Sequence, residues 1–337
     1  MNHKVDKIAV IGAGAAGLVA ARTMAQHGRS VTVFDKGRGP GGRMSTRRAG
    51  PYAFDHGAQY FTVRDPWTRE QIRDWQQKGV VAEWTGRIGE NDGAGGPILP
   101  VDGSVTRYVG VPGMNAIAKH LAAGLDIRLG VHVARVVGAS GAWYLHADGG
   151  EEFGPFGSVL VSTPPSQAAI LVAGVPGLAE RARRVVMEPV WALMATFTEP
   201  VDVSWDGIFC NDGPLSWVAR NGSKPGRGRH DSWVMHARSD WTHRHLENAP
   251  ESVSHMLLES FSAVIGIPLK SMDVEHASAH RWRFALATEP LHEGVIWDQA
   301  SQIGLCGDWC AGSRVEGALL SGRAAAHRVL EGGGFPG

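Results

Sequence analysis

Short apolar runs alternate with amphipathic stretches along this chain, and the pattern predicts an α/β fold. The apolar run at residues 8–11 predicts a buried strand. Residues 15–26 are rich in alanine and are followed by a glycine at position 28, which together predict a helix. A second apolar run at residues 31–34 predicts the next strand. These segments make one βαβ unit of roughly 30 residues.

Further elements follow the same rules. We expect helices over residues 66–77, 112–123, 253–264 and 315–330, and strands over residues 131–137, 143–147, 158–162, 190–198, 215–219, 232–237 and 303–308. The simplest architecture is a discontinuous Rossmann-type nucleotide domain with an inserted mixed α+β substrate domain. The nucleotide domain would take residues 1–70, 103–165 and 290–337, and the substrate domain residues 71–102 and 166–289.

Composition narrows the class of protein. The chain has 337 residues, of which 43% are hydrophobic, enough for two moderate domains. Its formal net charge is zero, so no global field draws it to nucleic acid or to a membrane surface. The apolar runs are too short for a signal peptide or a membrane span, and three cysteines fit a reducing compartment. We therefore expect a cytoplasmic protein without nucleic-acid or membrane partners; the sequence leaves its oligomeric state open.

The first βαβ unit carries a glycine motif at its turn. Residues 12–17 read Gly-Ala-Gly-Ala-Ala-Gly. In this motif the first glycine allows the turn, the second lets the backbone approach a pyrophosphate, and the third allows the helix to pack on the strand. Asp35 ends the second strand, where its carboxylate can accept hydrogen bonds from both adenosine ribose hydroxyls. The predicted dinucleotide contacts are Gly12, Ala13, Gly14, Ala16, Gly17 and Asp35.

A second glycine-rich loop at residues 37–44 helps to distinguish between NAD and FAD as the bound dinucleotide. An NAD dehydrogenase does not need a second loop of this kind, whereas the longer flavin dinucleotide does. Arg43 offers a planar cation to phosphates or to the edge of the flavin ring. The predicted cofactor is therefore FAD, and this loop adds Gly42, Arg43 and Met44 to its contacts.

A matching motif lies near the other end of the chain. Residues 303–308 predict a buried strand that ends at Asp308, just before a helix. A carboxylate there can hold the ribityl hydroxyls of the flavin, and backbone amides over residues 315–318 can face the ring or the pyrophosphate. This end adds Gly307, Asp308, Arg314, Val315 and Ala318 to the predicted contacts.

Several segments resemble known flavoproteins. Gly-Gly-Arg at residues 41–43 and Phe-Asp-His-Gly-Ala-Gln-Tyr-Phe at 54–61 resemble the flavin-containing amine oxidase superfamily. More narrowly, the segments at 34–36, 55–62, 217–225, 280–282, 306–310 and 314–318 look like those of the bacterial renalase family. The resemblance extends over about residues 7–330.

The resemblance implies a fold and a reaction. The fold is like that of p-hydroxybenzoate hydroxylase, with FAD bound non-covalently. The reaction is oxidation of the 1,2- and 1,6-dihydro isomers of NAD(P)H to NAD(P)⁺, after which dioxygen reoxidises the flavin and gives hydrogen peroxide. The superfamily alone also allows a flavin amine oxidase or a desaturase that acts on a small amine or an apolar substrate. The renalase-like segments favour the dihydronicotinamide.

The resemblance also assigns residues. It implies that Lys36 and Val133 lie on the cofactor, and that the turn carrying Ala58, Gln59, Tyr60 and Phe61 faces the flavin. The amide of Gln59 and the phenol of Tyr60 suit a nicotinamide carboxamide. Trp191 and Trp282 are candidates to wall the ring, and Asn221 and His236 to line the cavity. For the tryptophans and His236, ordinary core packing remains an open alternative.

Two absences from the sequence bear on the chemistry. We find no Ser/His/Asp arrangement and no metal-ligand spacing, so we predict neither a nucleophilic residue nor a metal. After Lys119 the lysines are Lys224 and Lys270, and the sequence places neither beside the flavin. This favours hydride transfer without an acid–base residue.

Overall fold

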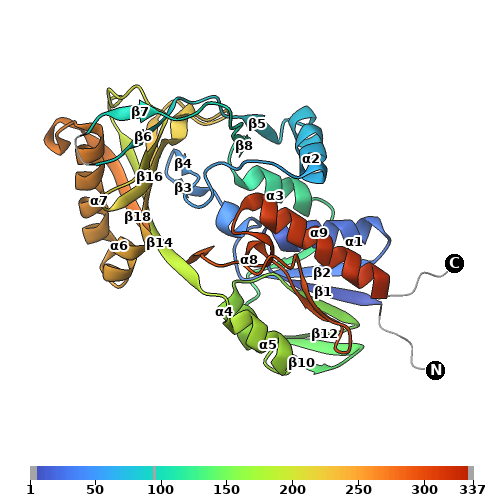
Figure 1. Ribbon diagram of the computed structural model, residues 1–337. Coiled ribbons are helices and arrows are strands. Elements are labelled where there is room, and N and C mark those ends of the chain that lie inside the picture. Colours follow the sequence, from blue (N-terminus) through green and yellow to red (C-terminus); the bar gives the residue numbers. More distant parts are fainter. Residues whose placement is uncertain (1–5, 94–95, 333–337) are drawn as a thin grey trace.

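The computed structural model describes residues 6–93 and 96–332 and contains two large sheets, each with its own layers of helices (Figure 1). The first sheet has six strands. Their order is β19 (Ile296–Asp298), β20 (Ile303–Leu305), β13 (Ser158–Val161), β1 (Lys7–Ile11), β2 (Ser30–Asp35) and β9 (Asp126–Leu129). Neighbouring strands are parallel, except that β19 runs antiparallel to β20. Segments from the start, middle and end of the chain thus share one sheet.

Both faces of the six-stranded sheet are buried, as in most parallel sheets. Ile8 and Val10 point to one face, and Ala9 and Ile11 to the other. The first face packs against α1 (Ala15–Gln26), α3 (Asn115–Ala122) and α9 (Val315–Gly332). The second packs against α4 (Pro165–Leu171), α5 (Pro176–Arg183) and a three-stranded sheet of β10 (Val133–Ala139), β11 (Ala142–Ala147) and β12 (Glu152–Phe156).

The second large sheet has seven strands. Their order is β18 (Val274–Ala287), β14 (Met187–Phe197), β17 (Asp231–Ala237), β16 (Leu215–Arg220), β15 (Gly207–Cys210), β6 (Ile88–Asn91) and β7 (Ile98–Pro100). Its outer face packs against α6 (Ser239–Arg244) and α7 (Pro250–Ile265), with Trp233 and Phe261 fully buried (Figure 1). Its inner face meets a hairpin of β3 (Arg47–Ala49) and β4 (Tyr52–Phe54), where Phe54 packs on Met194.

Smaller elements join the two sheets. They are α2 (Pro66–Gln77), the pair β5 (Val81–Glu83) and β8 (Tyr108–Gly110), α8 (Asp308–Ala311), and the 3₁₀ turns η1 (Gly42–Met44), η2 (Asn221–Ser223) and η3 (Leu269–Ser271). Asp65 caps α2 by accepting a hydrogen bond from the Thr68 backbone amide, and Pro66 occupies the first helical position.

The predicted fold class is confirmed, and two elements are corrected. Helix α3 begins at Asn115 rather than at residue 112, because the amide of Met114 donates to the carboxylate of Asp55 at 2.9 Å. The strand predicted over 303–308 ends at Leu305. Gly307 follows with a φ of +152°, a backbone conformation that favours glycine, and Asp308 already begins α8.

The division into two domains remains a proposal. Helices α4 and α5 pack into the core of the six-stranded sheet, whereas the predicted division places nearly all of both in the substrate domain. Their packing favours a boundary nearer residue 185 than 165. Over the residues that the structure describes, no helix combines the length and apolar character needed to span a bilayer.

Candidate functional site

The glycine motif lies in the turn between β1 and α1. A Cβ atom added to Gly17 would lie 2.0 Å from the carbonyl oxygen of Gly12, so only glycine allows this close approach. The same atom on Gly14 would meet nothing within 4 Å, so that face of the turn is open beside the N-terminus of α1. Amides at such a terminus attract a pyrophosphate. Ala13 and Ala16, also predicted contacts, are buried in the adjoining core.

Asp35 is held beside this turn. One carboxylate oxygen accepts a hydrogen bond from the Ala13 amide, and the other accepts one from the Gly37 amide, each at 2.6 Å. Each oxygen keeps a second lone pair, which suits a ribose hydroxyl. The Asp35 carbonyl accepts from the Val131 amide at 3.0 Å, which brings the start of β10 and the buried Val133 close by. The next residue, Lys36, is exposed.

The second glycine-rich loop folds onto the first. The Gly41 amide donates to the Ala13 carbonyl at 2.8 Å, and a Cβ atom on Gly42 would lie 3.5 Å from the Cα of Gly14. Met44 is buried in the core below them. The two predicted loops therefore form one continuous surface.

Arg43 and Asp308 meet across this surface. Two guanidinium nitrogens each donate to one carboxylate oxygen at 2.7 Å, and Arg43 also donates to the Ala285 carbonyl at 3.0 Å. The sequence suggested that each residue contacts the cofactor but not that they bind each other. Asp308 stands at the first position of α8, because Gly307 turns the chain after β20.

The start of α9 fits the prediction only in part. Val315 is the first residue of the helix, so its amide has no acceptor within the helix. The amide of Ala318 donates to the Arg314 carbonyl at 3.0 Å, so the predicted role of Ala318 as a free backbone donor is wrong. The Arg314 side chain is exposed. Glu316, which the sequence analysis missed, accepts hydrogen bonds from the amides of Arg64 and Asp65 at 2.7 and 2.8 Å and anchors the start of α2.

These groups fit FAD. The glycine turn, the helix N-terminus, the Asp35 carboxylate and the pair of Arg43 with Asp308 lie along the edge where the strands of the first sheet end. At the same edge, the hydroxyl of Thr163 is buried without a hydrogen-bond partner in the described part of the chain. A dinucleotide would supply phosphate and ribose acceptors and donors for this set.

The turn at residues 55–61 connects this edge to the second sheet. The Ala58 amide donates to the Arg43 carbonyl at 2.8 Å, and Phe61 forms a β-bridge with Tyr108. Gln59 is buried, with 4% of its surface exposed. The half-buried ring of Tyr60 lies 5.4 Å from the ring of Trp217.

Trp282 and His236 converge on this turn from the inner face of the seven-stranded sheet. The Trp282 indole nitrogen donates to the His56 carbonyl at 2.9 Å, and the Nε2 atom of His236 lies 3.1 Å from the same oxygen. His236 Nε2 is also 3.3 Å from the side-chain nitrogen of Gln59. The ring of His280 packs 4.6 Å from that of Trp282. The predicted residues Gln59, His236 and Trp282 are therefore neighbours.

The histidines here are neutral at pH 7. Burial lowers the pKa of His56 to about 3, with a further contribution from the nearby His280 and Arg47. Burial also lowers the pKa of His236 to about 4. The site therefore presents an uncharged aromatic wall.

Trp191 does not join this wall. It occupies β14, but its side chain points to the outer face, where it is 1% exposed and packs in the core under α7. Its indole nitrogen donates to the His245 carbonyl at 3.0 Å, and the Arg281 guanidinium lies 5.4 Å from its ring. The two side chains leave opposite faces of the sheet, so Trp191 does not wall one ring together with Trp282 as predicted, although Trp191 lines part of the cavity described below.

Lys224 is the main residue that the sequence did not place. It is fully buried, and its ammonium nitrogen lies 3.4 Å from Gln59 Oε1, 3.4 Å from Asn221 Oδ1 and 3.8 Å from Asp55 Oδ2. Burial lowers the pKa of Lys224 to about 7, although Asp55 opposes the shift. One feature of the sequence could have pointed to Lys224: lysine is rare in this half of the chain.

Asp55 and Asn221 organise the surroundings of Lys224. Asn221 donates to the Ala53 carbonyl at 2.8 Å and accepts from the Asp55 amide at 3.3 Å, so it supports the turn rather than lining an open cavity. Burial opposes ionisation of Asp55, but Lys224 and Arg227 more than offset it and lower its pKa. Arg227 donates directly to this carboxylate.

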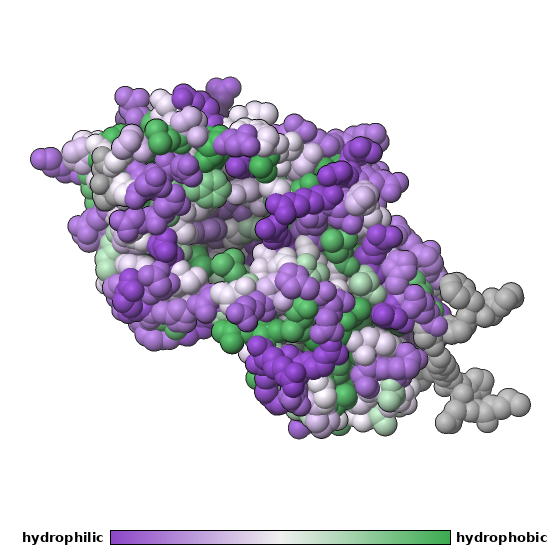
Figure 2. All heavy atoms as spheres, viewed as in Figure 1, coloured by the Kyte–Doolittle hydropathy of each residue, from purple (hydrophilic) through white to green (hydrophobic). Residues whose placement is uncertain are grey.

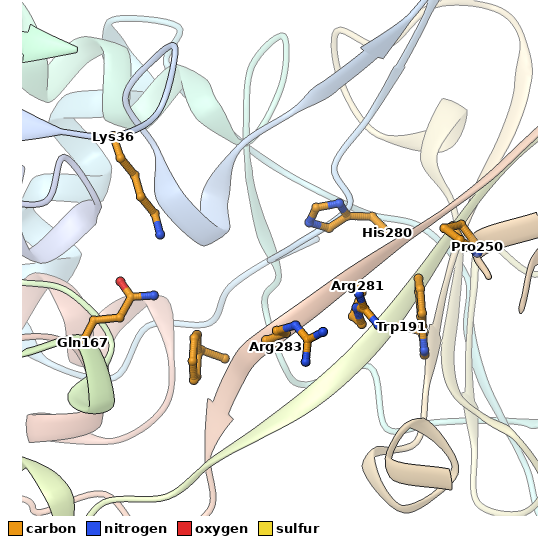
Figure 3. Close-up of a pocket in the computed structure, with 9 residues that line it drawn as sticks. Lys36, Gln167, Trp191, Pro250, His280, Arg281 and Arg283 are labelled. Atoms are coloured by element: carbon orange, nitrogen blue, oxygen red, sulfur yellow. The ribbon is translucent and has the colours of Figure 1, made fainter. Parts of the chain in front are cut away.

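A cavity of about 450 Å³ opens between the two sheets. Figure 2 shows the surface hollowed there, and Figure 3 shows Lys36 and Gln167 facing strand β18 across the gap. Its lining residues are Lys36, Gln167, Trp191, Pro250, Ala279, His280, Arg281, Arg283 and Phe284. Three of them carry positive charge, and none of the described residues that line it is acidic. Glu247, outside this lining, pairs with Arg281 at 2.8 Å and with Arg283 at 2.9 Å. His280 also contacts Trp282, so the cavity adjoins the aromatic wall.

Comparisons with known proteins agree with this arrangement. Residues 10–75 match the NAD(P)-binding Rossmann-like domain, and residues 80–263 match the family described as flavin containing amine oxidoreductase. A 4,4'-diapophytoene desaturase of Staphylococcus aureus (strain Newman) is 49% identical over 59 residues, which are 18% of this chain and 12% of the desaturase.

Two solved structures share the fold at low sequence identity. Cyclohexylamine oxidase from Brevibacterium oxydans IH-35A has a TM-score of 0.77 and 13% identity, and the match covers 97% of this chain and 99% of that one. A putrescine oxidase variant has a TM-score of 0.74 and 13% identity, with 96% and 98% covered. At this identity the likeness establishes the fold alone.

Proposed function

Because this chain belongs to the flavin-containing amine oxidoreductase family, we propose that it is an FAD-dependent oxidase of the 1,2- and 1,6-dihydro isomers of NAD(P)H. The product is NAD(P)⁺. Bound FAD would supply the hydride acceptor, and dioxygen, with one proton from solvent, would then take up both electrons and leave as hydrogen peroxide. The protein's own residues bind and orient the dihydropyridine ring, and they exclude water from it.

The positive charge around the site is the main observation that supports this proposal. Lys36, Arg281 and Arg283 line the cavity, and Glu247, which pairs with both arginines at 2.8 and 2.9 Å, leaves this group with a net positive charge. The buried Asp55 is paired with Lys224 and Arg227. Such surroundings favour a dinucleotide with two or three phosphates and disfavour an alkylammonium ion, the form that most amines take at pH 7.

The polar groups at the aromatic wall suit a carboxamide. Gln59 presents a side-chain nitrogen at this wall, and a carboxamide oxygen can accept from it. The neutral His236 and His56 add no charge that would hold a cationic substrate. Loss of hydride from a dihydropyridine restores an aromatic ring, so the step needs alignment more than a strong base.

Anaerobic mixing of the FAD-loaded protein with candidate donors tests the proposal. We expect chemically isomerised NADH to bleach the flavin at a catalytic rate. We expect ordinary 1,4-NADH to be slower by about a hundredfold, because its hydride leaves from a different ring carbon and about 1 Å of misplacement can cost that much. Equal rates with the isomers and with 1,4-NADH would defeat the proposed specificity.

An amine substrate is the second candidate, and Lys224 is the observation that favours it. A buried lysine with a pKa of about 7 is able to accept a proton from an ammonium substrate. The same experiment separates the two functions. Bleaching by benzylamine or a polyamine, with none by dihydronicotinamides, would place the amine first.

A further inference from the structure

Glu247 places a carboxylate on the two arginines that line the cavity along β18 (Figure 3). Its two oxygens accept from the two terminal nitrogens of Arg283, each at 2.9 Å, and Oε2 also accepts from Arg281 at 2.8 Å. A guanidinium group binds a phosphate through the same pair of parallel hydrogen bonds. The two arginines are therefore already arranged as they would be around a phosphate.

The Glu247 carboxylate can be displaced at little cost. Its side chain is 68% exposed, and ion pairs in such surroundings contribute little to stability. The backbone beside it is fastened separately, because Arg281 donates to the Leu246 carbonyl and the Trp191 indole donates to the His245 carbonyl at 3.0 Å. Glu247 can therefore turn into solvent while its segment of the chain stays in place.

The charge of Glu247 decides which anion can replace it. Each phosphate of the pyrophosphate bridge in a dinucleotide carries one negative charge, as the carboxylate does, so an exchange between them gains no charge. A phosphomonoester carries about 1.5–2 negative charges at pH 7. Its exchange for Glu247 would neutralise Arg281 and Arg283 more completely. The arrangement therefore favours a phosphomonoester over a phosphodiester.

The cavity gives one extended ligand access to both faces of β18. Among the described residues, β18 is an edge strand of the seven-stranded sheet. Arg281 pairs in register with Trp191 on the outer face, and alternation along the strand places Arg283 on the same face. His280, which contacts Trp282 on the inner face, lines the same cavity. A dinucleotide is long enough to reach from the aromatic wall around this edge, whereas a small amine is not.

We propose that Arg281 and Arg283 form a binding site for a phosphomonoester, which takes the place of the Glu247 carboxylate, and that its ligand is the 2′-phosphate of an NADP-type substrate. This deepens the proposed function and rests on it for the identity of the ligand. The nicotinamide ring lies at the aromatic wall on the inner face, and the adenosine end reaches the outer face. The enzyme then prefers the dihydro isomers of NADPH to those of NADH.

Calorimetric titration of the FAD-loaded protein with NADP⁺ and with NAD⁺ tests the proposal, because neither oxidised dinucleotide can reduce the flavin. We expect NADP⁺ to bind about tenfold more tightly, the lower end of the range for hydrogen bonds between charged groups. Arg283→Ala should remove most of this difference by weakening NADP⁺ far more than NAD⁺. Arg328→Ala, at a similarly exposed arginine beside a glutamate, should preserve it. Equal affinities in the wild type would overturn the proposal, and so would an undiminished preference in Arg283→Ala.

Glu247→Gln tests the exchange of carboxylate for phosphate. Without the competing charge, NADP⁺ should bind about two- to fivefold more tightly, as expected for the loss of one exposed ion pair. Glu331→Gln is the control, because Glu331 pairs with Arg328 far from the cavity lining. If Glu247 only fastened its segment, its substitution would weaken NADP⁺ binding or leave it unchanged. Either result would refute the exchange.

Nicotinamide mononucleotide, whose single phosphate is also a monoester, separates the two sources of this group. Weaker binding than that of NADP⁺ supports the 2′-phosphate, whereas binding as tight as that of NADP⁺ would refute that assignment. The titrations need no flavin reduction, so the two proposals fail separately. If no dihydronicotinamide reduces the flavin, the proposed function falls. If isomerised NADH reduces it but NADP⁺ binds no better than NAD⁺, the phosphomonoester site alone is refuted.

Discussion

Arg43 and Asp308, which are 265 residues apart in the sequence, form a bidentate ion pair in which both N–O distances are 2.7 Å. The side chain of Asp308 is 9% exposed and that of Arg43 is 30% exposed, so water screens the pair only in part. The pair joins the second glycine-rich loop to the start of α8. The ion pair therefore links the two cofactor motifs directly, in addition to the packing of α9 on α1.

We expect Asp308→Ala to weaken FAD binding about ten- to a hundredfold. The substitution removes a carboxylate that can accept from the ribityl hydroxyls, and it frees Arg43 from its fixed place; charge-assisted hydrogen bonds contribute about 1.5–3 kcal/mol each. Titration of the apoprotein with FAD, followed by flavin fluorescence, measures the effect. Asp126→Ala is the control, since Asp126 is exposed on β9. Equal affinities for the two variants would contradict the role of Asp308.

We expect the flavin to be bound non-covalently. Cys306 and Cys310, the cysteines nearest the cofactor motif at 307–308, are buried. Burial raises the pKa of Cys306 to about 12 and that of Cys310 well above its usual range, so neither is the thiolate that a covalent bond to flavin would require. Precipitation with acid should leave a yellow supernatant, and a yellow pellet would contradict this prediction.

The parts of the fold that depend on local signals could be predicted from the sequence. Helix α1 spans Ala15–Gln26 as expected, because its alanines lie within the segment and the glycine that marks its end follows two residues later, at position 28. The face to which Trp191 points could not be predicted. It is flanked by the apolar Val190 and Ala192, so no alternation marks the buried side, and pairing with β17 and β18 decides it.

Contacts between distant segments explain the other omissions. Strand β18 has 14 residues, many of them charged or half-buried, and its sequence lacks a clear alternation. Lys224 reaches Gln59 across 165 positions and Asp308 reaches Arg43 across 265. The sequence motifs indicated which segments lie near the cofactor. Which side chains of those segments bind each other could be seen only in the folded chain.

We expect stability to fall as the pH drops below about 6.5. The folded-state pKa is about 3 for His56 and about 4 for His236, both below the ordinary value of 6.5, so the unfolded chain binds more protons in this range. Each histidine contributes a slope of up to about 1.4 kcal/mol per pH unit, down to its folded-state pKa. Urea unfolding at pH 7, 6 and 5 measures the slope. His236→Gln should flatten it, whereas His255→Gln, at an exposed position on α7, should not.

We expect the capture of isomerised NADH to depend on salt. The cations at the cavity attract phosphates, and this attraction weakens with ionic strength. Arg283→Ala should lower the second-order rate of flavin reduction about two- to fivefold at low salt, an effect of the size expected for one partly exposed charge. Arg328→Ala is the matched control, because Arg328 is similarly exposed and also lies near a glutamate. If the simple N-methyl dihydropyridine isomers showed the same loss, the phosphates would not be the cause.

The two tryptophans of β14 and β18 give the sharpest contrast. Trp282→Phe keeps an aromatic ring but removes the donor to the His56 carbonyl. We expect it to slow reduction by isomerised NADH about tenfold and to narrow the gap to 1,4-NADH, because misalignment of the ring affects the faster donor most. Trp191→Phe removes a buried hydrogen bond to the His245 carbonyl on the opposite face. It should cost about 1–3 kcal/mol of unfolding free energy and leave the reduction rate within about twofold. Stopped-flow reduction and urea unfolding of both variants measure these effects. A loss of rate in Trp191→Phe equal to that in Trp282→Phe would show that the inner face of the sheet does not hold the substrate ring.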